Sequence, residues 1–193
     1  QYYGQKETFR LLDIGTGTGL LSLMLAQLHA TATVEAIELN KEAYEQALEN
    51  FVASPWKDRL DVKHTSLADF LQTTKTPRKY DLIICNPPFF HNQLQAPLQA
   101  RNEARHSISL SKEALAAAVA RLMEQGMFCV MYPEREWEDW MQAAEAAGLY
   151  CRQLLAVQPR SDLAVNRMIG FFSKKPAITV KEHLLIYEAD KSY

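Results

Sequence analysis

The chain has 193 residues, enough for one domain with a sizeable hydrophobic core. Hydrophobic residues make up 48% of the sequence, charged residues 23%, and the formal net charge is −2, which excludes the global basic excess of a polycationic nucleic-acid-binding protein. No apolar stretch approaches the ~20 residues that span a bilayer, and the first residues contain no secretory hydrophobic region, so we expect a cytoplasmic protein with no membrane partner.

Short apolar runs alternate with helical periodicity through the first half of the chain. Four strands are expected there, at 9–15, 33–39, 60–66 and 80–86. A helix is expected after each of the first three strands: within 17–28, over 40–51, and a short one around 68–71. This order predicts parallel strands joined by crossover helices.

The second half continues the alternation after a polar loop of about twenty residues, a length typical of functional loops. Ser111 is expected to cap a helix over 111–123, and a strand follows at 126–133. The next helix carries an apolar stripe for core packing and ends at Gly148. Two strand-like runs, 149–158 and 166–173, flank a hairpin connection.

These elements predict an α/β fold of the Rossmann-like type, with helices on both faces of one sheet. The sheet is expected to have seven strands, mostly parallel, with an antiparallel hairpin at its C-terminal end. We expect one domain over 1–193, with no internal repeat or linker. Ligands of such sheets bind beyond the carboxyl ends of the strands.

The three cysteines give no sign of a metal site. Cys85, Cys129 and Cys151 each lie in an apolar, strand-like context, and no cysteine or histidine spacing matches a ligand set. We expect them to be small buried hydrophobes in a reducing compartment, and we expect no metal.

A glycine-rich turn, D-I-G-T-G-T-G over 13–19, follows the first strand. Glycines let the backbone turn sharply and approach a ligand, and the next helix presents N–H groups to it. Asp13 places a carboxylate suited to an ammonium group, and Glu38, at the end of the second strand, is placed to accept hydrogen bonds from a ribose diol. The G-x-G-x-G spacing and this carboxylate pair favour S-adenosylmethionine over NAD, which also needs room for a pyrophosphate.

At these residues the sequence resembles the class I S-adenosylmethionine-dependent methyltransferases. The resemblance implies that the glycine turn forms the cofactor loop, that Glu38 binds the ribose, and that Ser66 and Leu67 stand where the adenine contacts lie. Serine is a departure there, because that family usually has an acidic residue. The cofactor-binding residues implied are Asp13, Gly15, Thr16, Gly17, Gly19, Glu38, Leu39, Ser66, Leu67 and Asn86.

The fourth strand ends in N-P-P-F over 86–89, the residues we name the Asn-Pro-Pro-Phe corner. An exocyclic amine is a poor nucleophile because its lone pair is delocalised into the ring. The Asn86 side-chain oxygen and the Pro87 carbonyl can each accept one N–H of such an amine, which releases the lone pair. Pro88 stiffens the turn and Phe89 offers a face for stacking on a base. Catalysis by orientation needs no general base.

This corner resembles the N-P-P-[FYW] motif of amino-group methyltransferases. With D-L-I-I-C-N-P-P-F-F, A-R-H-S-I-S-L-S and S-P-W-K-D-R-L, the chain is similar to the bacterial tRNA1(Val) adenine-N6 methyltransferase family. The resemblance implies a tRNA substrate methylated on an anticodon-loop adenine, and a chain that lacks an N-terminal segment and a short C-terminal tail. We expect a monomer.

A tRNA substrate requires phosphate contacts. Arg101 and Arg105, in the loop after the corner, are the first candidates for substrate binding, together with Phe89. Further candidates come from two other parts of the chain: Lys57, Arg59, Arg160, Arg167, Lys174 and Lys175.

Other functions stay open from the sequence. A protein glutamine-N5 methyltransferase makes the same demands on Asn86 and Pro87, as do enzymes acting on rRNA guanine N2 or DNA adenine N6. The A-R-H-x-x-S-L-S segment argues against the glutamine enzyme. A non-catalytic cofactor-binding or RNA-chaperone module is disfavoured because the corner is intact, and a nicotinamide oxidoreductase is disfavoured by the glycine spacing.

Overall fold

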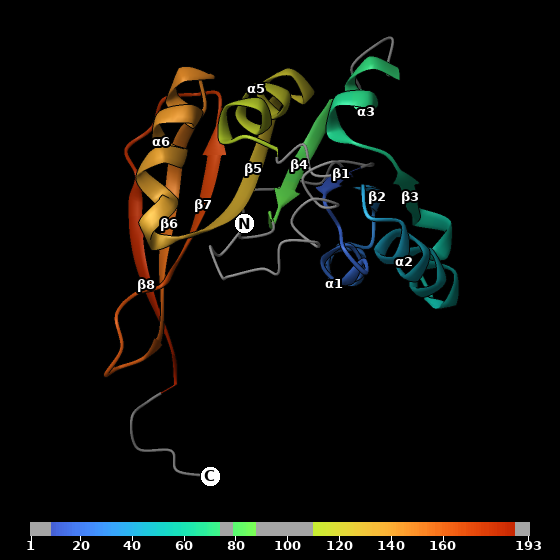
Figure 1. Cartoon of the computed structure of the whole chain (residues 1–193), viewed down its shortest axis with the longest axis horizontal. Helices are drawn as coiled ribbons and strands as arrows, with labels where there is room; N and C mark the ends of the chain where they lie inside the picture. Colours follow the sequence, from blue (N-terminus) through green and yellow to red (C-terminus); the bar gives the residue numbers. More distant parts are fainter. Residues whose placement is uncertain (1–8, 74–78, 88–109, 188–193) are drawn as a thin grey trace, which may run out of the picture.

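The chain folds into a single sheet with helices on both faces, as the computed structural model in Figure 1 shows. The structure describes residues 9–73, 79–87 and 110–187. Within these ranges the strand order is β3-β2-β1-β4-β5-β7-β6-β8. The strands are β1 Phe9–Ile14, β2 Ala32–Glu38, β3 Leu60–His64, β4 Tyr80–Cys85, β5 Met123–Pro133, β6 Tyr150–Arg160, β7 Arg167–Ser173 and β8 Val180–Tyr187. The helices are α1 Leu20–Leu28, α2 Lys41–Ala53, α3 Leu67–Thr73, α5 Lys112–Leu122 and α6 Trp137–Ala146, with short turns η1 Lys57–Arg59 and η2 Glu134–Glu136.

The predicted fold class is confirmed. Strands β1 to β5 pair in parallel, and β7 runs antiparallel to both β5 and β6. The count of seven strands was one too low, because β8 pairs in parallel with β6 at the edge of the sheet. Strand β5 also begins at Met123, inside the predicted helix, because Met123 pairs with Tyr80 across an irregular register.

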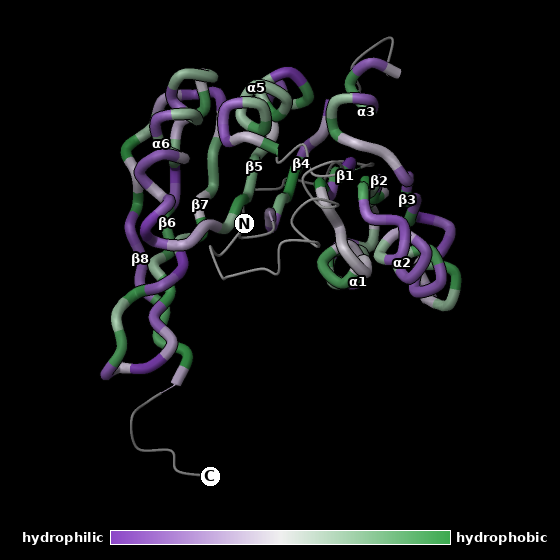
Figure 2. The backbone as a smooth tube through the Cα atoms, viewed as in Figure 1, coloured by the Kyte–Doolittle hydropathy of each residue, from purple (hydrophilic) through white to green (hydrophobic). Residues whose placement is uncertain are grey.

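Each face of the sheet has its own core. Helices α1 and α2 cover the face that carries Leu11, Val34 and Ala36. Helices α3, α5 and α6 cover the other face, where the largest cluster includes Phe128 and Trp140. The predicted stripe on α6 does pack in this core. Figure 2 shows the apolar positions concentrated in β4 and β5 at the centre and more hydrophilic positions around α2 and β8.

The cysteines lie in or beside these cores. Cys85 and Cys151 are buried as expected, whereas Cys129 is only partly buried, and all three are free thiols. Burial raises the pKa of the Cys85 and Cys129 thiols, so both stay protonated near neutral pH.

The parallel strands bring several chain segments to one edge of the sheet, which we name the carboxyl edge. Ile14 at the end of β1 pairs with Ile37 of β2 and with Cys85 of β4. Neighbouring strands lie ~4.8 Å apart, so the segments that follow β1, β2 and β4 start close together. The glycine turn, Glu38 and Asn86 therefore share this edge, as the sequence predicts.

Candidate functional site

The glycine turn is held by backbone hydrogen bonds and by left-handed glycine conformations. Gly15, Gly17 and Gly19 have φ angles of 71°, 59° and 84°. The N–H groups of Gly15 and Thr16 both donate to the Ile37 carbonyl, at 2.9 and 3.1 Å. Left-handed backbone costs glycine little, and most N–H groups of the turn are used inside it: Gly17 donates to Glu38 and Gly19 to the Thr16 carbonyl. The N–H groups left without an intrahelical acceptor are those of the first turn of α1, which begins at Leu20.

Asp13 lies beneath this turn. Its side chain is 1% exposed, and one carboxylate oxygen accepts hydrogen bonds from the hydroxyls of Thr16 and Ser22, each at 2.7 Å. Burial raises the pKa of Asp13, and these two hydrogen bonds oppose the rise. Asp13 therefore fixes the turn to α1, and its predicted contact with the cofactor ammonium group stays a prediction.

Glu38 connects the turn to the start of α2. One carboxylate oxygen accepts the Gly17 N–H and the other accepts the Asn40 N–H, both at 2.8 Å. Asn40 in turn caps α2 through the Ala43 N–H. Each carboxylate oxygen keeps a further acceptor site, so the group is oriented in advance to receive two hydroxyl donors.

Leu39 lies next to Glu38 with its side chain 48% exposed. Its carbonyl accepts a hydrogen bond from Nε2 of His64, at 3.0 Å, and the His64 ring stacks on Tyr44 with centroids 5.3 Å apart. His64 therefore holds the backbone of Leu39 in place, and the Leu39 side chain offers exposed apolar surface beside Glu38. Sequence reasoning missed His64, Tyr44 and Ser22, because their partners lie on other elements.

The predicted adenine pair is arranged less openly. The Ser66 hydroxyl caps α3, accepting the Asp69 N–H at 3.0 Å and donating to the Asp69 carboxylate at 2.7 Å. The Leu67 side chain is buried in the core. An adenine contact by Ser66 must share or replace the Asp69 hydrogen bond, and both adenine contacts stay predictions.

The Asn-Pro-Pro-Phe corner is described only in its first half. Cys85 ends β4 as a buried residue, Asn86 follows as an exposed one, and Pro87 is partly buried. The strand thus delivers Asn86 to the carboxyl edge beside the turn that begins at Gly15. Four predicted site residues lie outside the described residues: Pro88, Phe89, Arg101 and Arg105.

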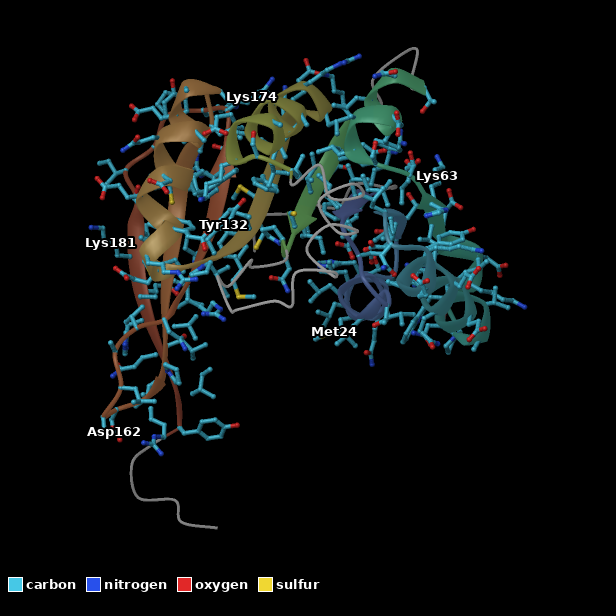
Figure 3. The ribbon with its side chains drawn as sticks, viewed as in Figure 1. Met24, Lys63, Tyr132, Asp162, Lys174 and Lys181 are labelled. Carbon is cyan, nitrogen blue, oxygen red and sulfur yellow. The ribbon has the colours of Figure 1, made fainter. Side chains whose placement is uncertain are left out.

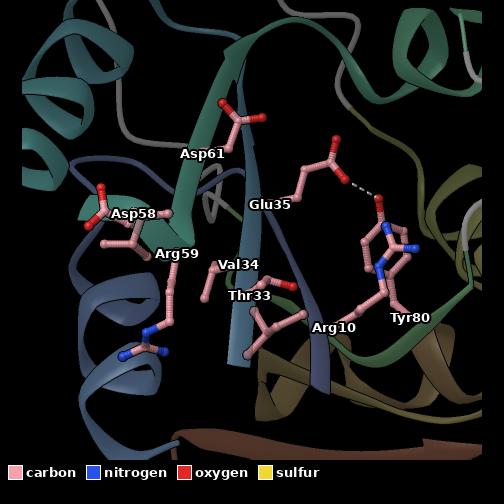
Figure 4. Close-up of a pocket in the computed structure, with 10 residues that line it drawn as sticks. Arg10, Thr33, Val34, Glu35, Asp58, Arg59, Asp61 and Tyr80 are labelled. Carbon is pink, nitrogen blue, oxygen red and sulfur yellow. Dashed lines mark hydrogen bonds between the residues drawn. The ribbon is translucent and has the colours of Figure 1, made fainter. Parts of the chain in front are cut away.

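A cavity of about 200 Å³ lies at the opposite, amino edge of the sheet (Figure 4). Two of its polar lining side chains, Glu35 and Tyr80, are hydrogen-bonded to each other. The Tyr80 hydroxyl donates to Glu35 at 2.6 Å, and Lys63 pairs with the other Glu35 oxygen. This network stabilises the start of the strands and is remote from the candidate site.

The cationic side chains predicted to contact phosphate divide between the two edges. Arg59 donates to the carbonyls of Ala26, His29 and Ala32, so its guanidinium caps the end of α1 at the amino edge. Lys174 and Lys175 follow β7 at that same edge, whereas Arg160 and Arg167 flank the β6–β7 turn at the carboxyl edge. Figure 3 shows Lys174 at the top of the C-terminal strands and Asp162, which lies in that turn, at their bottom.

Within residues 9–73, 79–87 and 110–187, no three His, Cys, Asp or Glu side chains gather as a metal site. No helix in that part of the chain has the length and apolar character needed to cross a bilayer.

Comparisons with known proteins agree with this geometry. The methyltransferase small domain model matches residues 4–144. A tRNA1(Val) (adenine(37)-N6)-methyltransferase of Tolumonas auensis is 40% identical over 186 residues, covering 95% of this chain and 76% of the relative. The enzyme of that name from Vibrio parahaemolyticus is 38% identical over 181 residues, covering 93% and 74%.

Solved structures share the fold. A protein of Agrobacterium tumefaciens described as a predicted O-methyltransferase has a TM-score of 0.73 at 17% identity, covering 98% of this chain and 86% of its own. A precorrin-6y C5,15-methyltransferase of Geobacter metallireducens has a TM-score of 0.62 at 13% identity, covering 89% and 82%. The chain belongs to the methyltransferase small domain family and, within it, to the family of its tRNA1(Val) (adenine(37)-N6)-methyltransferase relatives.

Proposed function

We propose that the chain transfers a methyl group from S-adenosylmethionine to the exocyclic N6 amine of an adenine in tRNA. The main support for the proposal is that three features lie at one edge of the sheet: the glycine turn, the oriented Glu38 carboxylate and the exposed Asn86. The names of the relatives, which are 36 to 40% identical, point to adenine 37 of tRNA1(Val) as the target.

The cofactor half of the site suits adenosine with an amino-acid tail. Glu38 accepts the ribose hydroxyls, and the N–H groups of the first turn of α1, which lack intrahelical acceptors, face the tail. Leu39 offers apolar surface beside the adenine ring. When bound, S-adenosylmethionine supplies an electrophilic methyl group on a sulfonium centre.

The nucleophile half suits a planar group that carries an amine. Asn86 and Pro87 accept the two N–H hydrogens and direct the nitrogen lone pair toward the methyl group. The cofactor would supply the methyl group and leave as S-adenosylhomocysteine, and the nitrogen held by Asn86 and Pro87 would lose its extra proton to water. Orientation of this kind can lower the activation free energy by ~7–11 kcal/mol.

The partner implied is tRNA, whose base must leave its stack to reach Asn86. We infer action in the cytoplasm, where tRNA is modified in bacteria, and a monomeric enzyme.

The test is to incubate the protein with methyl-labelled cofactor and total tRNA, digest the tRNA and identify the labelled nucleoside. We expect N6-methyladenosine from a valine tRNA. A parallel reaction with a glutamine-containing protein substrate serves as the comparison, since an amide nitrogen can occupy the same corner. Label in glutamine and none in tRNA would refute the proposal.

A further inference from the structure

The C-terminal strands carry a charge excess that the catalytic site does not use. Residues 149–187 contain six Lys and Arg against two Asp and Glu, a net +4, whereas the whole chain has −2 and its remainder −6. Two of these six, Lys174 and Lys175, lie at the amino edge, so the rest of the segment carries +2. A segregated basic segment in a slightly acidic protein is typical of a surface for a polyanion.

These strands project from the carboxyl edge, on which Asn86 also lies. The pairing row that contains Cys85 runs through Val130, Gly170 and Leu154 to Lys181. Strand β8 continues six residues past that row to Tyr187, and Figure 1 shows the β6–β7 turn and the end of β8 extending past α6. Six residues span ~20 Å, so the projection reaches well beyond the catalytic corner.

One face of this projection is basic and aromatic. Alternate residues of β8 share a face, so Lys181, His183 and Tyr187 point the same way, with the partly buried Leu185 between the last two. Arg160 joins this face because it pairs directly with Tyr187. The side chains of Lys181, His183, Tyr187 and Arg160 are exposed, Tyr187 to 54%. We name these four residues the β8 row.

The acidic residues of the segment do not interrupt the β8 row. Glu182 points to the other face, where it accepts a hydrogen bond from Gln153 at 2.9 Å. Asp162 pairs with Arg160 through two hydrogen bonds of 2.6 and 2.9 Å, which holds the guanidinium at the turn. Exposed ion pairs are weak, so a phosphate can share this guanidinium.

We propose that the β8 row binds the phosphodiester backbone of the RNA that flanks the target base. This inference rests on the proposed function and adds the surface on which the substrate docks. Lys181 lies four strand spacings from Cys85, ~19 Å, a distance that a folded RNA spans and a single nucleotide does not. Tyr187 offers a ring for stacking directly beside Arg160, with which it pairs.

The test compares two matched double variants of the full chain, each removing two positive charges. Arg160→Gln with Lys181→Gln changes the β8 row, and Lys174→Gln with Lys175→Gln changes the amino edge. We expect the first pair to raise the KM for tRNA about tenfold at 0.15 M salt and to reduce the salt slope of binding by ~1.4–1.8, because each backbone contact contributes ~0.7–0.9. Cofactor affinity and the rate at saturating tRNA should not change. The second pair should match the wild type.

Lys181→Gln alone controls for damage to the turn that Arg160 holds, and it should show about half of the change in salt slope. Equal behaviour of the two double variants, with wild-type tRNA methylation intact, would overturn the β8 row and leave the proposed function standing. Absence of tRNA methylation by the wild type, with label in a protein glutamine, would overturn both.

Discussion

Gly19 is the position where the structure predicts the largest effect of adding a single methyl group. It caps α1 with φ of 84°, and a Cβ built there would lie 2.5 Å from Cε1 of Phe51. Phe51 belongs to α2, is 2% exposed and packs in the core with Ala36 and Val62, so the ring cannot move away easily. Gly19→Ala therefore combines left-handed backbone strain with a steric clash.

The two effects have separate magnitudes. A non-glycine residue in the left-handed region costs ~1–2 kcal/mol. Overpacking a well-packed core costs a further ~1–3 kcal/mol. Gly19→Ala should thus lower the free energy of unfolding by ~2–5 kcal/mol. Gly148→Ala is the matched control, since Gly148 has φ of 73° and no atom within 4 Å of its Cβ position, leaving ~1–2 kcal/mol of backbone strain alone.

Urea unfolding followed by circular dichroism measures both values through the midpoint at constant slope. A third variant isolates the ring: in a Phe51→Leu background, Gly19→Ala should cost no more than Gly148→Ala does. Equal costs of Gly19→Ala and Gly148→Ala in the wild-type background would refute the clash as the source of the additional loss.

Three further predictions concern the groups beneath the site and at the amino edge. Tyr80→Phe removes the hydrogen bond to buried Glu35 and should lower the free energy of unfolding by ~1–3 kcal/mol, with unchanged cofactor affinity in a calorimetric titration. Because the pKa of Asp13 is raised, the folded state keeps the Asp13 proton at pH values where the unfolded state has lost it. The free energy of unfolding should therefore fall as pH rises from about 4 toward that raised pKa. Asp13→Asn should show a smaller fall over this range in urea unfolding at several pH values. Arg59→Met leaves the final carbonyls of α1 without their donor and should cost ~1–3 kcal/mol while tRNA affinity stays the same, and a loss of tRNA affinity alone would mean that Arg59 contacts RNA.

Much of the fold followed from periodicity, because most elements have one buried face. Strands β1 and β2 lie within one residue of the prediction at each end, since their apolar runs are bounded by the glycine turn and by Asn40. Strand β8 was missed because V-K-E-H-L-L-I-Y has no buried face: seven of its eight residues are exposed. An edge strand of this kind is specified by its pairing with β6, which no local pattern records.

The site residues that directly follow a parallel strand were predictable, because the order of the strands alone places them at the carboxyl edge. Parallel strands bring their carboxyl ends together, so Glu38 and Asn86 were expected beside the glycine turn. Ser22 was missed because the pattern L-L-S-L-M predicts only that this serine lies in a helix. Its hydroxyl is brought to 2.7 Å from the Asp13 carboxylate by the fold. Ser66 shows the converse, since its side chain caps α3 through Asp69, a local role that the family comparison did not suggest.

The measurement that tests the central claim most directly pairs cofactor binding with single-turnover methyl transfer in Asn86→Ala. Asn86 is exposed at the carboxyl edge, and the hydrogen bonds that join Glu38 to Gly17 and Asn40 do not involve its side chain. We expect the cofactor dissociation constant to stay within about threefold of wild type and the transfer rate to fall by about 10²–10³, the loss typical of one positioned hydrogen-bonding group. Equal loss of binding and transfer, or transfer at the wild-type rate, would contradict the assignment of Asn86 to the nucleophile.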